Sequence, residues 1–77
     1  MTQLVSPAPR LDSTPALGDI CDRCGVAAKL QVELDVGGAL TFCGHHANEH
    51  AKEIVRRAAG LVVEDGFDWR GFAHREW

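Results

Sequence analysis

Two short pairs of cysteine and histidine residues constrain this chain more than any other feature. Two residues separate Cys21 from Cys24, and Cys43 and His46 repeat that spacing after an eighteen-residue interval. Thiolate sulfur and imidazole nitrogen are preferred donors of tetrahedral zinc, and a C-x2-C turn holds two sulfurs at a suitable separation. The interval is long enough for a β-hairpin that returns the second pair to the first. The spacing therefore predicts one structural zinc ion, bound by these four side chains.

A chain this small needs disulfides, a metal or a partner to stabilise its fold. It has 77 residues, and its three prolines all lie within residues 1–19. That segment shows no helical or alternating apolar pattern, so we expect it to be a flexible N-terminal arm. We place the zinc-binding domain at residues 20–61, and so small a core rarely supplies more than about 3–5 kcal/mol by itself. Structural zinc contributes about 10–16 kcal/mol in small peptides at neutral pH, so folding should depend on the ion.

The residues between the two ligand pairs carry the pattern of a β-hairpin. Apolar and polar side chains alternate from residue 29 to residue 36, which predicts a strand with one buried face. Gly37 and Gly38 suit a two-residue turn, because both central positions of a type I′ turn need a positive φ. Residues 39–42 should then form the return strand.

A helical pattern follows the second ligand pair and runs to about Ala59. Apolar side chains recur at spacings of three and four and form one stripe, made of Ala47, Ala51, Ile54, Val55, Ala58, Leu61 and Val62. Gly60 is a suitable end for such a helix. The sequence therefore predicts a small α+β domain, stabilised by zinc, in which a cysteine turn, a hairpin and a helix follow one another.

The fourth zinc ligand is less constrained than the first three. His46 completes C-x2-H and is favoured, while His45 and His50 stay open as alternatives. Residues 46–50 also spell H-x-x-E-H, a metalloprotease pattern in which Glu49 would be the general base. Those enzymes need a further distant ligand and a substrate cleft, for which this chain has no room. Three cysteines and one histidine leave zinc no open position, so we predict that the protein is not an enzyme.

Three short motifs resemble a known family. They are Cys-Asp-Arg-Cys-Gly at 21–25, Gly-Gly at 37–38 and Phe-Cys-Gly-His-His at 42–46. Over residues 20–58 the chain resembles a family of short actinobacterial and actinophage proteins known only as a domain of unknown function. The resemblance implies the same zinc-held hairpin and helix, and it implies no activity. The order of elements also resembles treble-clef zinc folds, with a zinc ribbon as the second possibility.

Residues 62–77 form an aromatic C-terminal tail, which holds four of the five aromatic side chains of the chain. Phenylalanine, tryptophan and arginine dominate the binding energy of many protein interfaces. We therefore predict a partner-binding set made of Phe67, Trp69, Arg70, Phe72 and Trp77. The alternative, that these rings pack over the hairpin and enlarge a small core, stays open.

The charge of the chain favours a protein partner over nucleic acid. Its formal net charge is −3, so it has no general attraction to a phosphate backbone. We expect a small structural-zinc protein that acts as a protein–protein interaction module, with a regulatory role as one form of it. The alternative is a nucleic-acid-associated zinc module of the transcription or translation machinery. It would use the available cations, which are Arg23, Lys29, Lys52, Arg56 and Arg57.

The sequence also predicts where the protein works. No stretch approaches the roughly 20 apolar residues of a membrane span, and no basic region followed by an apolar run marks a secretory signal. An odd number of cysteines argues against a disulfide framework. We therefore expect a cytoplasmic protein with no membrane partner.

Overall fold

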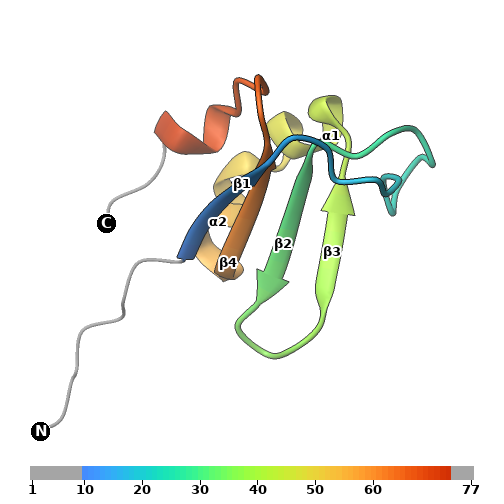
Figure 1. Ribbon diagram of the computed structural model, residues 1–77. Helices are drawn as coiled ribbons and strands as arrows, with labels where there is room; N and C mark the ends of the chain where they lie inside the picture. The colour runs from blue at the N-terminus through green and yellow to red at the C-terminus, as the bar shows by residue number, and fades with distance from the viewer. Residues whose placement is uncertain (1–9, 74–77) are drawn as a thin grey trace, which may run out of the picture.

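The structure, a computed structural model, describes residues 10–73 as one sheet covered on one face by short helices (Figure 1). The elements in chain order are β1 (Arg10–Thr14), β2 (Leu30–Leu34), β3 (Ala39–Phe42), α1 (Gly44–Glu49), α2 (Ala51–Arg57), β4 (Ala58–Glu64) and the 3₁₀ helix η1 (Arg70–Ala73). The strand order is β1-β4-β2-β3. Strand β1 runs parallel to β4, whereas β2 is antiparallel to both of its neighbours. Within residues 10–73, no helix has the length and apolar character needed to cross a membrane.

The predicted hairpin is confirmed. Strand β2 pairs with β3 in a register that places Leu30 opposite Phe42 and Val32 opposite Leu40. Leu30 and Val32 are 0% and 1% exposed, so the predicted apolar face is the core face of the sheet.

The predicted two-residue turn is wrong, because β2 ends at Leu34 and not at residue 36. The amide of Leu34 donates to the carbonyl of Gly38 at 2.9 Å and the amide of Gly37 donates to the carbonyl of Leu34 at 3.0 Å, so residues 35–37 form the loop. Gly37 and Gly38 have φ of 102° and 88°, a conformation that costs glycine little because it has no Cβ.

The expected flexible arm of residues 1–19 is wrong for Arg10–Thr14, which form β1. Residues 1–9 lie outside the described part of the chain. Strand β1 is mostly exposed and pairs with β4 through its backbone, from Arg10 opposite Gly60 to Thr14 opposite Glu64. Backbone pairing at a sheet edge requires no alternating apolar pattern, which is why periodicity did not predict this strand.

The expected helix is wrong beyond Arg57. Helix α1 ends at Glu49, a break follows at His50 with φ −105° and ψ 20°, and α2 ends at Arg57. Leu61 and Val62, which we assigned to the helical stripe, lie in β4. Strand β4 is central, and hydrogen bonds to β1 and β2 on both sides outweigh the local helical period. A domain boundary at residue 61 is therefore wrong as well, because β4 continues to Glu64.

Gly60 on β4 allows an ion pair to form between side chains of the two strands that flank β4. The Arg10 guanidinium on β1 pairs with the Glu33 carboxylate on β2, and β4 lies between these two strands. A side-chain carbon at Gly60 would lie only 2.7 Å from Glu33 Oε1. Glycine is usually unfavourable inside a strand, and here it provides the space for this contact.

A second ion pair gives a pH dependence to the stability. Lys29 Nζ lies 2.8 Å from Glu64 Oε2. The hydrogen bond from Lys29, supported by the backbone amide of Leu17, lowers the pKa of the Glu64 carboxyl. The carboxylate therefore stabilises the fold above the ordinary carboxyl pKa of about 4.3, and this stabilisation is lost as the pH falls through the lowered value.

We expect Lys29→Met to lower the unfolding midpoint at neutral pH, with a difference from the wild type that shrinks as the pH falls below about 4. Carboxyl-carbon NMR should show the pKa of Glu64 rising toward its ordinary value in this variant. Lys52→Met is the matched control, since it removes the same charge from the exposed surface of α2. A pH-independent difference for Lys29→Met, or an equal one for Lys52→Met, would contradict this account.

Candidate metal centre

The four predicted ligand side chains meet beside the start of α1. Cys21 and Cys24 come from a loop of residues 20–27, which we call the cysteine loop and which a bridge between Ile20 and Ala27 closes. Cys43 is the N-cap of α1 and His46 lies in its first turn. The donor atoms of Cys21, Cys24, Cys43 and His46 all lie within 4.8 Å of one another.

The individual distances define a compact set of donors. Cys24 Sγ lies 3.8 Å from Cys43 Sγ. The Nδ1 atom of His46 lies 3.5 Å from Cys21 Sγ and 3.4 Å from Cys43 Sγ. The histidine therefore presents Nδ1, rather than Nε2, to the sulfurs. These four side chains could hold a metal ion.

Short hydrogen bonds shape the cysteine loop. The amide of Cys21 donates to the carbonyl of Val26 at 2.7 Å, and the amide of Gly25 donates back to the carbonyl of Cys21 at 2.9 Å. Gly25 has φ 81°, so the chain can turn away beneath the donors. This local geometry brings two sulfurs to one side of a tight turn.

Asp22 fixes the cysteine loop to the outer edge of β3. The amide of Thr41 donates to Asp22 Oδ2 at 2.9 Å, and the amide of Asp22 donates to the carbonyl of Thr41 at 2.9 Å. The Thr41 hydroxyl donates to the carbonyl of Ile20 at 2.5 Å. Sequence analysis missed this role of Asp22, although an acidic residue between two ligand cysteines is a visible signal for it.

The surroundings of Cys21 and Cys24 shift the pKa values of these two thiols in opposite directions. Burial raises the pKa of Cys21, but the backbone amides of Cys43, Arg23 and Cys24 and the side chain of His46 outweigh it and lower the pKa to about 6. The amide of Val26 lowers the pKa of Cys24, yet burial and the neighbouring sulfurs of Cys21 and Cys43 raise it overall. Three sulfurs this close repel one another as thiolates, and a cation among them removes that repulsion.

The alternative histidines lie outside the cysteine cluster. His45 Nε2 lies 3.6 Å from Glu49 Oε1, and His50 Nε2 lies 3.9 Å from the same oxygen. His45, His46 and Glu49 form a second close group, but it shares His46 with the cysteines. The ring of His50 stacks on that of His46 with centroids 6.2 Å apart. Among the candidates, the structure brings His46 to the sulfurs.

The ring of Trp69, predicted to contact a partner, belongs to the core of the described chain. Trp69 is 1% exposed, and its Nε1 donates to the carbonyl of Ala47 in α1 at 2.8 Å. The ring of Phe72 packs edge-on against it with centroids 5.4 Å apart. The core of so small a sheet is incomplete without this indole, which agrees with the alternative in which the tail enlarges the core.

The other predicted partner residues are less buried. Phe67 and Phe72 are half-buried and pack against the core cluster. Arg70 is exposed, and its backbone amide donates to Asn48 Oδ1 at 2.7 Å. Trp77 lies outside the described residues.

Fold and site define the class: a small α+β protein with a Cys3His cluster that could hold a metal ion. Residues 15–68, more than half of the chain, match the family described as Domain of unknown function (DUF7455). The chain belongs to this family. The match includes all four donors and extends ten residues beyond the 20–58 resemblance, into the tail. No match was found among curated proteins or among solved structures.

Proposed function

We propose that this protein is a structural-zinc module that binds another protein. One observation carries the choice of metal. A tetrahedral zinc ion with Zn–S of about 2.3 Å and Zn–N of about 2.0–2.1 Å places its sulfurs about 3.8 Å apart and sulfur and nitrogen about 3.5 Å apart. Here the sulfurs of Cys24 and Cys43 are 3.8 Å apart, and His46 Nδ1 lies 3.5 Å from the sulfur of Cys21 and 3.4 Å from that of Cys43. The remaining donor pairs lie within 4.8 Å.

The donor set supports a structural role. Three cysteines and one histidine complete a tetrahedral shell, so no position is left for a substrate or a reactive water. One ligand pair lies on the cysteine loop and the other on the first turn of α1, with the β2–β3 hairpin between them. This order of elements favours a treble-clef arrangement over a zinc ribbon, in which both pairs lie on turns. Zinc would join the hairpin to the helices.

A groove beside the hairpin supports the protein-binding role. This groove, which we call the α2–β3 groove, has a volume of about 350 Å³ and runs between α2 and the sheet. It is lined by Arg23, Val32, Leu34, Leu40, Phe42, His50, Glu53, Ile54 and Arg57. Leu40 is 38% exposed, although its side chain lies on the core face of the sheet. An apolar floor with charged residues at its rim is typical of a surface that binds a peptide or a helix.

We expect purified protein to contain one zinc per chain by elemental analysis, and a tagged copy to retain a protein partner from its source cells. Leu40→Asp should reduce that capture about tenfold or more, because it places a charge on the groove floor. Val36→Asp is the matched control, since Val36 is 87% exposed on the adjacent turn. The metal proposal fails if folded protein contains no zinc, and the groove proposal fails if Leu40→Asp captures its partner normally.

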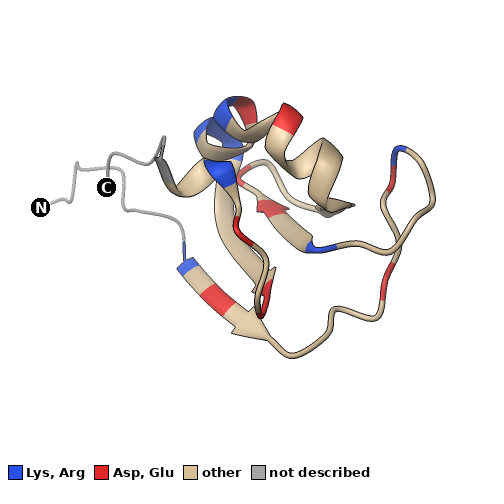
Figure 2. Cartoon of the chain, turned by 90° about the horizontal axis from the view of Figure 1, so that it is seen from above, with Lys and Arg blue, Asp and Glu red and all other residues tan. Residues whose placement is uncertain are grey.

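Nucleic-acid binding is the second candidate, because basic side chains gather on α2 (Figure 2). Glu53 reduces their effect, however, since it pairs with Arg56 at 3.5 Å and with Arg57 at 2.6 Å. The protein partner is therefore favoured. Binding of DNA or RNA that weakens steeply as salt increases would reverse this preference.

A further inference from the structure

The two edges of the sheet differ in their backbone partners. At the β3 edge, Asp22 accepts from the amide of Thr41 and donates to its carbonyl, so the cysteine loop covers this part of the edge. Strand β1 forms the opposite edge, and no described residue pairs with its outer side as a strand. An uncovered strand edge presents free amides and carbonyls that can pair with another chain.

The register identifies the outward backbone groups of β1. Thr14 lies opposite Glu64, and the amide of Asp65 donates to the carbonyl of Thr14 at 2.8 Å. The backbone of Thr14 therefore faces β4. Because amide and carbonyl directions alternate along a strand, the backbone groups of Leu11 and Ser13 face away from β4, toward the open edge.

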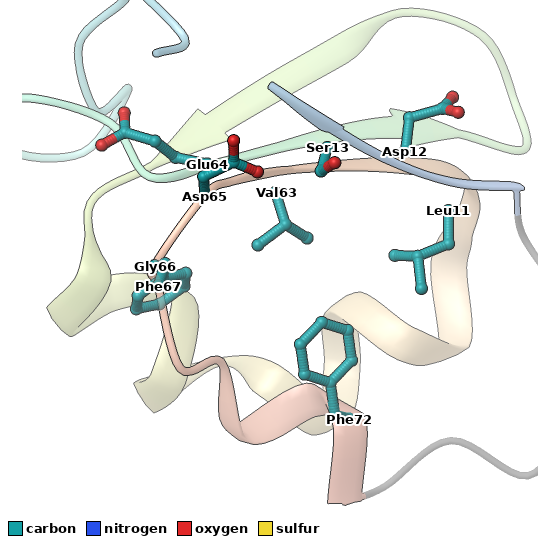
Figure 3. A pocket seen from close by; sticks show the side chains of 9 residues that line it. All are labelled: Leu11, Asp12, Ser13, Val63, Glu64, Asp65, Gly66, Phe67 and Phe72. Atoms are coloured by element: carbon teal, nitrogen blue, oxygen red, sulfur yellow. The ribbon is translucent and has the colours of Figure 1, made fainter. Parts of the chain in front are cut away.

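An apolar hollow lies under this edge. It has a volume of about 370 Å³, and its lining includes Leu11, Val63, Phe67 and Phe72. Figure 3 shows Leu11, Val63 and Phe72 directed into the space between β1, β4 and η1, with Phe67 at its margin. Leu11 is 43% exposed, so the hollow opens beside the unpaired strand. A strand added to β1 would direct every second side chain toward this hollow.

The surroundings of the hollow are acidic. Its lining contains Asp12, Glu64 and Asp65 and no lysine or arginine among the described residues. Lys29 neutralises Glu64, whereas the carboxylates of Asp12 and Asp65 have no ion pair within residues 10–73. In Figure 3 the Asp12 carboxylate points to the face of the sheet opposite Leu11. An added strand would thus meet an apolar surface on one face and negative charge on the other.

We propose that the open edge of β1 binds an extended segment of a partner protein in which apolar residues alternate with lysine or arginine. The segment pairs with the outward backbone groups of Leu11 and Ser13. Its apolar side chains enter the hollow beside Phe72, and its basic side chains approach Asp12 and Asp65. The inference rests on the proposed protein-binding role, but it concerns a surface at the opposite edge of the sheet from the α2–β3 groove.

The test uses the zinc-loaded full chain and a synthetic peptide, acetyl-Lys-Val-Lys-Val-Lys-Val-amide, followed by amide NMR. The peptide should shift the amides of β1 saturably and slow hydrogen exchange at Leu11 and Ser13 about tenfold or more. A Glu-Val peptide and a Lys-Ser peptide of equal length should bind at least about tenfold more weakly, because the first is repelled and the second cannot fill the hollow.

Two variants test the geometry. Ser13→Pro removes an outward amide and should weaken the Lys-Val peptide about tenfold, while Ser13→Ala, which keeps that amide, should bind normally. If the proline variant does not fold, Asp12→Asn with Asp65→Asn replaces it and should reduce the preference for Lys-Val over Glu-Val. Equal peptide binding by the variant used and by the wild type would overturn the proposal.

Three further outcomes would also overturn it. The first is the absence of saturable binding. The second is protection of the Leu11 and Ser13 amides in the free protein, which would assign the edge to the chain's own residues or, if protection grows with protein concentration, to a second copy. The third is peptide shifts confined to the surroundings of Leu40, which would leave the α2–β3 groove, and with it the proposed function, intact.

Discussion

Removal of the metal, by a chelator or by Cys43→Ser, is expected to unfold most of the chain. The buried cluster is small, and the cysteine loop is joined to α1 chiefly through the four donors. Structural zinc supplies about 10–16 kcal/mol in small peptides, whereas a core of this size supplies about 3–5 kcal/mol. If the proposed ion is removed, three clustered sulfurs lack a positive charge to offset their mutual repulsion.

Cys43→Ser is an informative substitution because serine is a good N-cap. The N-cap hydrogen bond, which Cys43 Sγ now accepts from the amide of His46 at 3.4 Å, can therefore be kept. Far-UV circular dichroism should show loss of helix and strand signal for this variant and for the chelated wild type. His45→Ala is the control, since His45 is exposed and outside the cysteine cluster, and it should keep both zinc and signal. An unchanged spectrum in metal-free protein would refute this expectation.

Trp69→Ala should lower the free energy of unfolding of the zinc-loaded protein by about 3–5 kcal/mol, the usual cost of deleting a buried aromatic ring. The ring is 1% exposed and is the largest fully buried side chain of residues 10–73. Trp69→Phe should cost less, but it leaves the buried carbonyl of Ala47 without the donor at 2.8 Å, a loss of about 1–3 kcal/mol.

Gly71→Ala tests the same packing from the other side. A side-chain carbon at Gly71 would lie 2.1 Å from Trp69 Cζ2, so the indole could not keep its position. We expect a loss similar to that of Trp69→Ala. Arg70→Ala is the control, because this exposed side chain lies between the two positions and should cost about 0.5 kcal/mol or less. Urea unfolding measures all four variants; a Trp69→Ala protein as stable as the wild type would show that the ring does not stabilise the core.

The hairpin and the clustering of the four candidate donors could be predicted because each depends on short-range rules. Alternation along residues 30–34, together with a positive φ at Gly37 and Gly38, specifies two paired strands without reference to the rest of the chain. The two short spacings carry their own geometry, since a tight turn holds Cys21 and Cys24, and the N-cap and first turn of α1 hold Cys43 and His46. That geometry brings Cys21 and Cys24 to Cys43 and His46 once the hairpin returns the chain.

Strands β1 and β4 could not be predicted from period alone. Leu61 and Val62 match a helical stripe as well as they match a strand, although the run Leu61-Val62-Val63 contains two β-branched residues, which was the available signal. The choice depends on β2 and β1 being present on either side to accept hydrogen bonds. Strand β1 carries even less pattern, because its side chains are mostly exposed and it joins the sheet through backbone pairing with β4.

The role of the tail was likewise decided by tertiary packing. The sequence shows that Trp69 is a large apolar side chain that is expected to be buried. It does not show whether residues of this chain or of a partner protein bury it. In the structure the Trp69 ring is buried within this chain and donates to the carbonyl of Ala47, a partner that is present only once α1 lies beside the tail. The sequence therefore predicts those structural features whose contacts form between neighbouring residues. Contacts with a distant segment are determined only by the folded chain.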